Sequence, residues 1–235
     1  MTTTRLYLIR HGQTAHSAAD RFSGASDVDL ADEGRRQAEC LAARLAGAPL
    51  AAFYCSPLRR AVETATLVAR PHGLTPTPVA DLREIDYGHW EGLPRDEVLA
   101  RFGEEYAAWG RDPLTGAPRD GETGLAVLAR MLPALRDIVQ RHPGQAVAVV
   151  AHKSANRLAL CGLLGLDSRT YRDRLDQSPA CLNIVDFGDE GQARLVLFND
   201  VSHYADPLGR GLVGGSAAPL APCGVGVAPS PLGAG

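Results

Sequence analysis

Imidazole and cationic side chains stand side by side after two apolar segments of the sequence. Arg10 and His11 follow the segment LYLI, and His152 and Lys153 follow the segment AVAVVA. A neutral imidazole is a nucleophile towards phosphorus, and guanidinium groups bind phosphate oxygens through paired hydrogen bonds. Residues of these types therefore predict a phosphate site with chemistry at a histidine.

A third apolar segment, LAAFYC, is followed by Ser56, Arg59 and Arg60. If the three segments are parallel strands, their carboxyl ends meet at one edge of the sheet, where open α/β folds bind ligands. The cations would repel one another there unless an anion lay between them. We expect backbone N–H groups at Gly12, and at the helix starts after Ser56 and Ser154, to add donors. The neighbouring cations are expected to keep the histidines neutral near pH 7.

An alkoxide leaving group needs a proton, and one acidic segment offers three donors. The sequence LREIDYGHWEG contains Glu84, Asp86 and Glu91, and their spacing does not choose among them. No His, Cys and Asp cluster has the spacing of metal ligands. We therefore expect the reaction to need no metal and no other cofactor.

The elements that must position these residues follow from the periodicity of apolar side chains. Strands are predicted at 5–10, 50–56 and 145–152, a hairpin at 180–188 and 193–199, and helices at 30–47, 57–69, 93–110, 121–142 and 154–165. Pro57 is predicted to open its helix, Pro133 to kink its helix, and 71–92 to be mostly loop. This alternation predicts a three-layer α/β/α fold with a mostly parallel central sheet.

Composition limits the function classes and divides the chain of 235 residues into two parts. Residues 1–206 are predicted to form the catalytic domain, and the Gly-, Pro- and Ala-rich residues 207–235 a flexible tail. A net charge of −3 gives no reason to expect nucleic acid or a membrane surface, and no apolar run is as long as a membrane span. Five scattered cysteines without a CxxC pair, and no secretory signal, predict reduced thiols and a cytoplasmic location.

Five blocks, in order, resemble the histidine phosphatase superfamily, the phosphoglycerate mutase-like group. They are LIRHGQT, RFSGASDVDLADEGRRQA, CSPLRRAVETA, LREIDYGHWEG and VVAHKSANRLAL. The resemblance implies a phosphoglycerate mutase-like fold, with His11 becoming phosphorylated and Glu84 donating the proton. It implies that Arg10, Arg60 and His152 hold the phosphoryl group. The implied activity is metal-independent hydrolysis of a small phosphorylated metabolite through a phosphohistidine.

The sequence departs from the family pattern at several positions near the expected pocket. His16 and Ser17 replace the usual Trp and Asn, so Ser17 is a candidate substrate contact in place of the asparagine. Lys153 follows the second histidine where glycine is usual, and its side chain either adds a cation to the site or points away. Ser23 and Gly24 align with a substrate-contacting loop, although they are also ordinary turn residues.

Two other functions remain open at this point. One is a cofactor-dependent phosphoglycerate mutase, but that branch typically reads LNERHYG where this chain has LREIDYG, and it carries longer insertions. The other is a phospho-ligand binding module without catalysis, which the complete residue set disfavours. Family habit also suggests a homodimer.

Overall fold

A six-stranded sheet forms the centre of the structure, a computed structural model that describes residues 2–205. The strands are β1 (Thr4–Arg10), β2 (Leu50–Cys55), β3 (Thr77–Pro78), β4 (Ala146–Ala151), β5 (Leu182–Phe187) and β6 (Ala193–Asp200). Their order is β3-β2-β4-β1-β5-β6, in which the first four are parallel and the β5–β6 hairpin is antiparallel. The predicted mostly parallel sheet and the predicted hairpin are confirmed.

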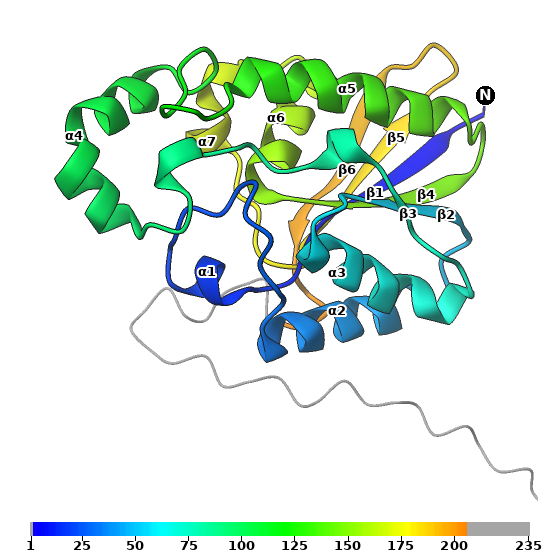
Figure 1. The fold of residues 1–235 in the computed structure, drawn as a ribbon. Coiled ribbons are helices and arrows are strands. Elements are labelled where there is room, and N and C mark those ends of the chain that lie inside the picture. Colours follow the sequence, from blue (N-terminus) through cyan, green and yellow to red (C-terminus); the bar gives the residue numbers. More distant parts are fainter. Residues whose placement is uncertain (1, 206–235) are drawn as a thin grey trace, which may run out of the picture.

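Helices cover both faces of this sheet (Figure 1). They are α1 (Ala15–Ala18), α2 (Asp32–Leu45), α3 (Arg59–Ala69), α4 (Arg95–Arg111), α5 (Gly124–Gln140), α6 (Lys153–Leu164) and α7 (Tyr171–Arg174). Single 3-10 turns lie at Arg70–His72, Ala80–Leu82, Gly88–Trp90 and Ser168–Thr170. Figure 1 shows α2 and α3 on one side of the sheet and α5 and α6 on the other, so the three-layer prediction is confirmed.

The inner strands are buried on both faces because their side chains alternate between two cores. Leu6 and Leu8 of β1 lie in the core formed with α5 and α6, whereas Tyr7 and Ile9 lie in the core formed with α2 and α3. Burial of one such aliphatic side chain contributes about 1.5–3 kcal/mol. The two cores therefore hold the ends of β1 and its neighbours in fixed positions.

A smaller aromatic cluster lies outside the two main cores. Its buried members are Phe22, Trp90, Val98 and Trp109, which join the segment after α1 to the loop before α4 and to α4 itself. The chain is bent within α4 at Phe102, whose φ of −133° and ψ of 34° are not helical. This cluster sets the position of α4 relative to the loops at the end of the sheet.

Several element boundaries differ from the sequence prediction. Pro57 does not open a helix, because Leu58 is extended (φ −68°, ψ 135°) and α3 begins at Arg59. The helix α5 continues on both sides of Pro133. The short elements α1, α7 and β3 have no counterpart in the prediction, since they hold too few residues to show a period. The predicted tail at 207–235 lies outside the described residues.

Candidate active site

The carboxyl ends of β1, β2 and β4 meet at one edge of the sheet, as predicted. The strands are neighbours, and their register brings Arg10 opposite Ala151 and Cys55 opposite Val150. The pairing continues one residue further, because the His11 N–H donates to the Ala151 carbonyl at 3.0 Å. The imidazole rings of His11 and His152 consequently lie 5.1 Å apart, centroid to centroid.

One hydrogen bond defines the tautomer of His11. Its Nδ1 lies 2.7 Å from the Gly12 carbonyl oxygen, which can only accept, so Nδ1 carries the proton. The lone pair of the neutral ring is then on Nε2. Burial and the nearby Arg60 and Arg10 guanidinium groups lower the pKa of His11 well below its usual value. The ring is therefore neutral and nucleophilic at neutral pH.

Buried nitrogen atoms around His11 have no hydrogen-bond partner among residues 2–205. They are Nε of Arg10, Nε of Arg60 and both ring nitrogens of His152. Each of the three residues is at most 6% exposed, and the pKa of His152 is lowered by burial and by Arg60. Buried polar groups are normally satisfied, and a phosphate group offers acceptor oxygens for the two arginine Nε–H groups and for the single N–H of the neutral His152 ring.

The remaining donors of the two arginines hold the surrounding loops. Arg10 donates from NH1 to the Gln177 carbonyl at 2.6 Å. Arg60 donates to the carbonyls of Ser26 at 2.7 Å and Gly24 at 2.8 Å. Arg59, in contrast, is exposed and pairs with Asp27. The geometry thus places Arg60, and not its neighbour, beside the histidines.

The structure distinguishes the three candidate acids, which their spacing in the sequence did not. Glu84 is 5% exposed and lines the cavity next to His11. The carboxylate of Asp86 instead accepts the Gly88 N–H, and that of Glu91 accepts N–H groups from the loop at 24–26, so neither lines the cavity. Only Glu84 of the three is positioned to exchange a proton with a group bound there.

The backbone donors expected for phosphate are already used within the protein. The Gly12 N–H donates to Thr64 Oγ1 at 3.1 Å. At the start of α6, the N–H groups of Ser154 and Ala155 donate to the two carboxylate oxygens of Glu84, each at 2.9 Å. At the start of α3, the Arg59 N–H donates to Asp27 at 2.8 Å. The expectation was wrong for these donors because they bind groups of the chain itself, carboxylates at both helix starts. A phosphate at this edge would therefore be bound mainly by side chains.

The other residues predicted to contact substrate differ in their access to the cavity. Ser17, Ser23 and Lys153 line it, but Gly24 does not. The Ser17 hydroxyl is used in a capping box with Thr14 at the start of α1, whereas the buried Ser23 Oγ has no partner in the described chain. Gly24 is required for packing, because a Cβ there would lie 1.9 Å from the Ile85 carbonyl oxygen.

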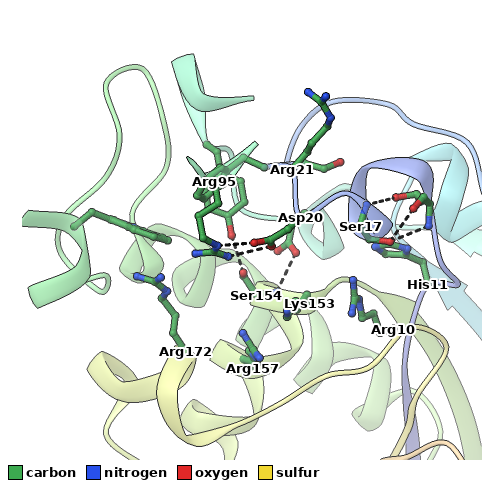
Figure 2. A pocket seen from close by; sticks show the side chains of 16 residues that line it. Arg10, His11, Ser17, Asp20, Arg21, Arg95, Lys153, Ser154, Arg157 and Arg172 are labelled. Atoms are coloured by element: carbon green, nitrogen blue, oxygen red, sulfur yellow. Dashed lines mark hydrogen bonds and ion pairs between the residues drawn. The ribbon is translucent and has the colours of Figure 1, made fainter. Parts of the chain in front are cut away.

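The cavity extends from His11 towards α7 (Figure 2). It has a volume of about 120 Å³ and is lined by Arg10, His11, Thr14, Ser17, Asp20, Arg21, Phe22, Ser23, Glu84, Tyr87, Arg95, Trp109, Lys153, Ser154, Arg157 and Arg172. The sequence prediction did not include the distal side chains of Arg157 and Arg172. One signal was available, since Arg157 lies in the predicted helix 154–165 four residues after Lys153, a spacing that puts both on one face once the helix is extended by one residue.

Three further features of the described chain concern metal binding, membrane spans and the cysteines. Within residues 2–205 there is no group of three or more His, Cys, Asp or Glu side chains that could hold a metal ion. None of the described helices is long and apolar enough to cross a membrane. Cys55, Cys161 and Cys181 are buried free thiols.

Comparison with known proteins agrees with this geometry. The chain is 33% identical to phosphoserine phosphatase 1 of Hydrogenobacter thermophilus over 69% of its own length and 77% of that protein. It is 35% identical to glucosyl-3-phosphoglycerate phosphatase of Mycolicibacterium vanbaalenii, over 71% of this chain and 76% of that one. The solved structure of Bacillus stearothermophilus YhfR has a TM-score of 0.80 at 31% identity, covering 85% of this chain and 98% of that one.

Some relatives are longer than this chain. Three mycobacterial proteins are each 36% identical to it over 206 residues, and the chain spans 55% of their length.

A family model describes almost the whole structured part of the chain. Residues 6–201 match the histidine phosphatase superfamily, branch 1, and the chain belongs to that superfamily. Within the superfamily it is a phosphoric monoester hydrolase, as its phosphatase relatives indicate. The predicted family and the predicted phosphatase activity are confirmed.

Proposed function

We propose that the chain hydrolyses a small phosphorylated metabolite through a phosphohistidine at His11. The Nε2 lone pair of His11 attacks phosphorus, and the bond from phosphorus to the alcohol oxygen breaks. Glu84 gives its proton to the departing oxygen, so a neutral alcohol leaves. Glu84 then takes a proton from water, whose oxygen attacks phosphorus and breaks the bond to His11. Inorganic phosphate leaves, and both side chains return to their starting states.

The remaining site residues stabilise charge during both steps. Arg10, Arg60 and His152 surround the position of the phosphoryl group, where negative charge on its oxygens must be stabilised in the transition state. Ser23 and Lys153, and Ser17 at the rim, are positioned for the alcohol part or for an outer phosphate oxygen. Gly24 contributes through its backbone contact with Arg60.

One observation carries this proposal. The His11 ring is buried, protonated at Nδ1 by its bond to Gly12, and within 5.1 Å of a second buried imidazole. A ring held in this way presents an unprotonated Nε2 without further rearrangement. The low pKa of His11 supports the same role, because it keeps the nucleophile neutral.

The test is phosphate release from a panel of phosphorylated metabolites, with the His11→Ala variant as the blank. We expect His11→Ala to abolish turnover while the variant still folds, as judged by circular dichroism and thermal unfolding. His72→Asn is the matched control. Arg60 lies at the N-terminal end of α3, whereas His72 lies just beyond its C-terminal end, away from the site. Rapid quenching at alkaline pH, where phosphohistidine survives, should recover a phosphoryl group on a peptide containing His11 and none in the variant.

The outcomes of this test separate the alternatives. Turnover by His11→Ala, or a phosphoryl group on a different residue, would overturn the proposal. Isomerisation of 3-phosphoglycerate without phosphate release would indicate a mutase. Binding of phosphate esters without labelling or turnover would indicate a binding module.

The names of the relatives suggest where to begin the panel. Phosphoserine and glucosyl-3-phosphoglycerate are the substrates named for two of them. We further propose a metal-independent reaction, a catalytic domain at residues 1–206, a cytoplasmic location and a homodimer. Turnover in the presence of excess chelator tests the metal-independent reaction, and sedimentation of the purified protein tests the homodimer.

A further inference from the structure

We propose that the distal end of the cavity, formed by Lys153, Arg157 and Arg172, binds a second anionic group on the alcohol part of the substrate. This group is a carboxylate or a second phosphate, and the three residues are called the distal cationic wall. The inference depends on the proposed phosphatase reaction at His11 and specifies its substrate class. In Figure 2, Arg157 and Arg172 lie on the opposite side of Lys153 from His11.

The charges that line the cavity do not balance. The cationic side chains are Arg10, Arg21, Arg95, Lys153, Arg157 and Arg172, and the acidic ones are Asp20 and Glu84. Asp20 is already paired with Arg95 at 2.7 Å, and Glu84 accepts backbone N–H groups. A phosphoryl group at His11 would satisfy Arg10, but the distal cations Lys153, Arg157 and Arg172 would still outnumber the carboxylates near them, of which Asp176 pairs with Arg157.

Within residues 2–205, the Arg172 side chain contacts aromatic groups of α4 and not a carboxylate. Lys153 has no carboxylate of the described chain within ion-pair distance, and Asp176 and Asp20 act on it only from further away. Lys153 is half-buried, and burial together with Arg10 and Arg157 lowers the pKa of its ammonium group. Arg157 is paired at 2.9 Å with Asp176, which is 67% exposed, so water weakens that pair. The Arg157 Nε is buried and has no hydrogen-bond partner among residues 2–205.

The guanidinium group of Arg172 is held in place before any ligand binds. Its central carbon lies 3.7 Å from the centroid of the Trp109 ring, which is buried in the aromatic cluster. Tyr106 of the same helix α4 accepts a longer hydrogen bond from NH2, at 3.4 Å. A stacked guanidinium loses little conformational freedom on binding and keeps its edge available for an anion.

The spacing along α6 separates this subsite from the site of phosphoryl transfer. Lys153 is the first residue of α6 and Arg157 lies one turn further, about 6 Å along the axis. The residue before the helix is His152, which lies beside His11. A substrate with its phosphate at His11 would therefore place its other end, a few bonds away, against Lys153, Arg157 and Arg172.

Two matched pairs of substrates test the subsite. 3-Phosphoglycerate and glycerol 3-phosphate differ only in a carboxylate against a hydroxymethyl group. Fructose 1,6-bisphosphate and fructose 6-phosphate differ in a second phosphate. We expect kcat/KM to favour the anionic member of at least one pair by about 10-fold or more, because charged hydrogen bonds are strong in a partly desolvated site. The preferred pair identifies the anion as carboxylate or phosphate.

The wall residues are then changed one at a time. Arg172→Gln and Arg157→Gln should lower kcat/KM for the substrate with two anionic groups about 10- to 100-fold more than for the matched substrate with the phosphate alone. The loss should come mainly from a higher KM. Arg174→Gln is the matched control, since Arg174 is an exposed arginine on the same short helix. A folding defect would lower both members equally, so the ratio between them reports the subsite.

The result that would overturn the inference differs from the one that would overturn the proposed function. The distal cationic wall binds no second anion if kcat/KM is the same for the substrates with and without a second anionic group. The same follows if Arg172→Gln and Arg157→Gln leave the ratio of these two kcat/KM values unchanged. If no phosphate ester labels His11, the phosphatase mechanism fails first.

Discussion

At the scale of single residues, the reactivity of each histidine in this site depends on which of its ring nitrogens already forms a hydrogen bond within the protein. His11 donates from Nδ1 and so presents Nε2, while both ring nitrogens of His152 have no partner within the described residues. A histidine with one nitrogen committed to a carbonyl is suited to nucleophilic attack. A neutral histidine whose N–H has no partner within the protein is suited to donating that N–H to a phosphate oxygen.

Glu84 has an asymmetric environment that fits a proton carrier. Among residues 2–205, its Oε1 accepts the N–H groups of Ile85 and Ala155, whereas Oε2 accepts only that of Ser154. Since each carboxylate oxygen has two acceptor positions, Oε2 keeps one for the proton. The backbone thus fixes the orientation of the carboxyl group and leaves one oxygen free to react.

The Glu84→Gln variant tests this role. We expect kcat/KM to fall about 100-fold or more for glycerol 3-phosphate, whose alkoxide needs a proton, and much less for p-nitrophenyl phosphate, whose phenolate leaves without one. The measurement is kcat/KM, because it reports transfer to His11 and not the later hydrolysis. Equal losses for the two esters would contradict the acid role.

At the scale of elements, a loop at residues 23–27 connects the phosphate pocket to the chain before α4. Glu91 accepts N–H groups from Gly24, Ala25 and Ser26 and also from Tyr87. Arg60 donates to two carbonyls of the same loop. Glu91 is therefore a positioning residue, acting on Arg60 through the loop between them.

The Glu91→Gln variant should affect both stability and phosphate binding. A neutral amide accepts fewer of these N–H groups, so we expect a loss of about 1–3 kcal/mol in the free energy of unfolding. We also expect the inhibition constant of inorganic phosphate to rise several-fold, because Arg60 is less well held. Urea unfolding and phosphate inhibition measure the two effects. Glu104→Gln, at an exposed position of α4, is the control, and an unchanged inhibition constant would refute the positioning role.

At the scale of the whole molecule, a chain with a net charge of −3 surrounds a strongly cationic cavity. His11, which lines the cavity, and His152 beside it are both buried and neutral, and their pKa values are lowered by burial first and then by Arg60. Such groups make the stability of the fold depend on pH. In the unfolded chain each histidine takes up a proton near pH 6.5, but in the folded chain it does not.

The unfolded state therefore binds more protons below pH 6.5, and the free energy of unfolding should fall as the pH is lowered from 6.5 to 5. Each histidine contributes about 1.4 kcal/mol per pH unit in this window. Urea unfolding in phosphate-free buffer measures the slope. In the His152→Gln variant, the free energy of unfolding should depend less steeply on pH, by the contribution of one histidine. A free energy of unfolding that does not change with pH in the native protein would contradict the proposal that both buried histidines are neutral.

Much of this architecture follows from local patterns. The long strands and helices were predictable because burial on one or two faces imposes a period on the side chains, and the polar residues at three strand ends marked the site edge. The spacing of Glu84, Asp86 and Glu91 did not choose among them, and only the family resemblance indicated Glu84. All three carboxylates lie in one irregular loop, where no period links sequence spacing to direction.

The sequence by itself determined the family, the layered sheet and the edge at which the histidines and arginines meet, because these depend on residue type and on strand order. Only the tertiary structure decided how the Glu84 carboxyl group is held, which backbone donors are already used, and that Arg172 stacks on Trp109 in the cavity that Lys153 and Arg157 also line. Those contacts join segments distant in the chain. Their geometry depends on how the packed layers bring the loops together.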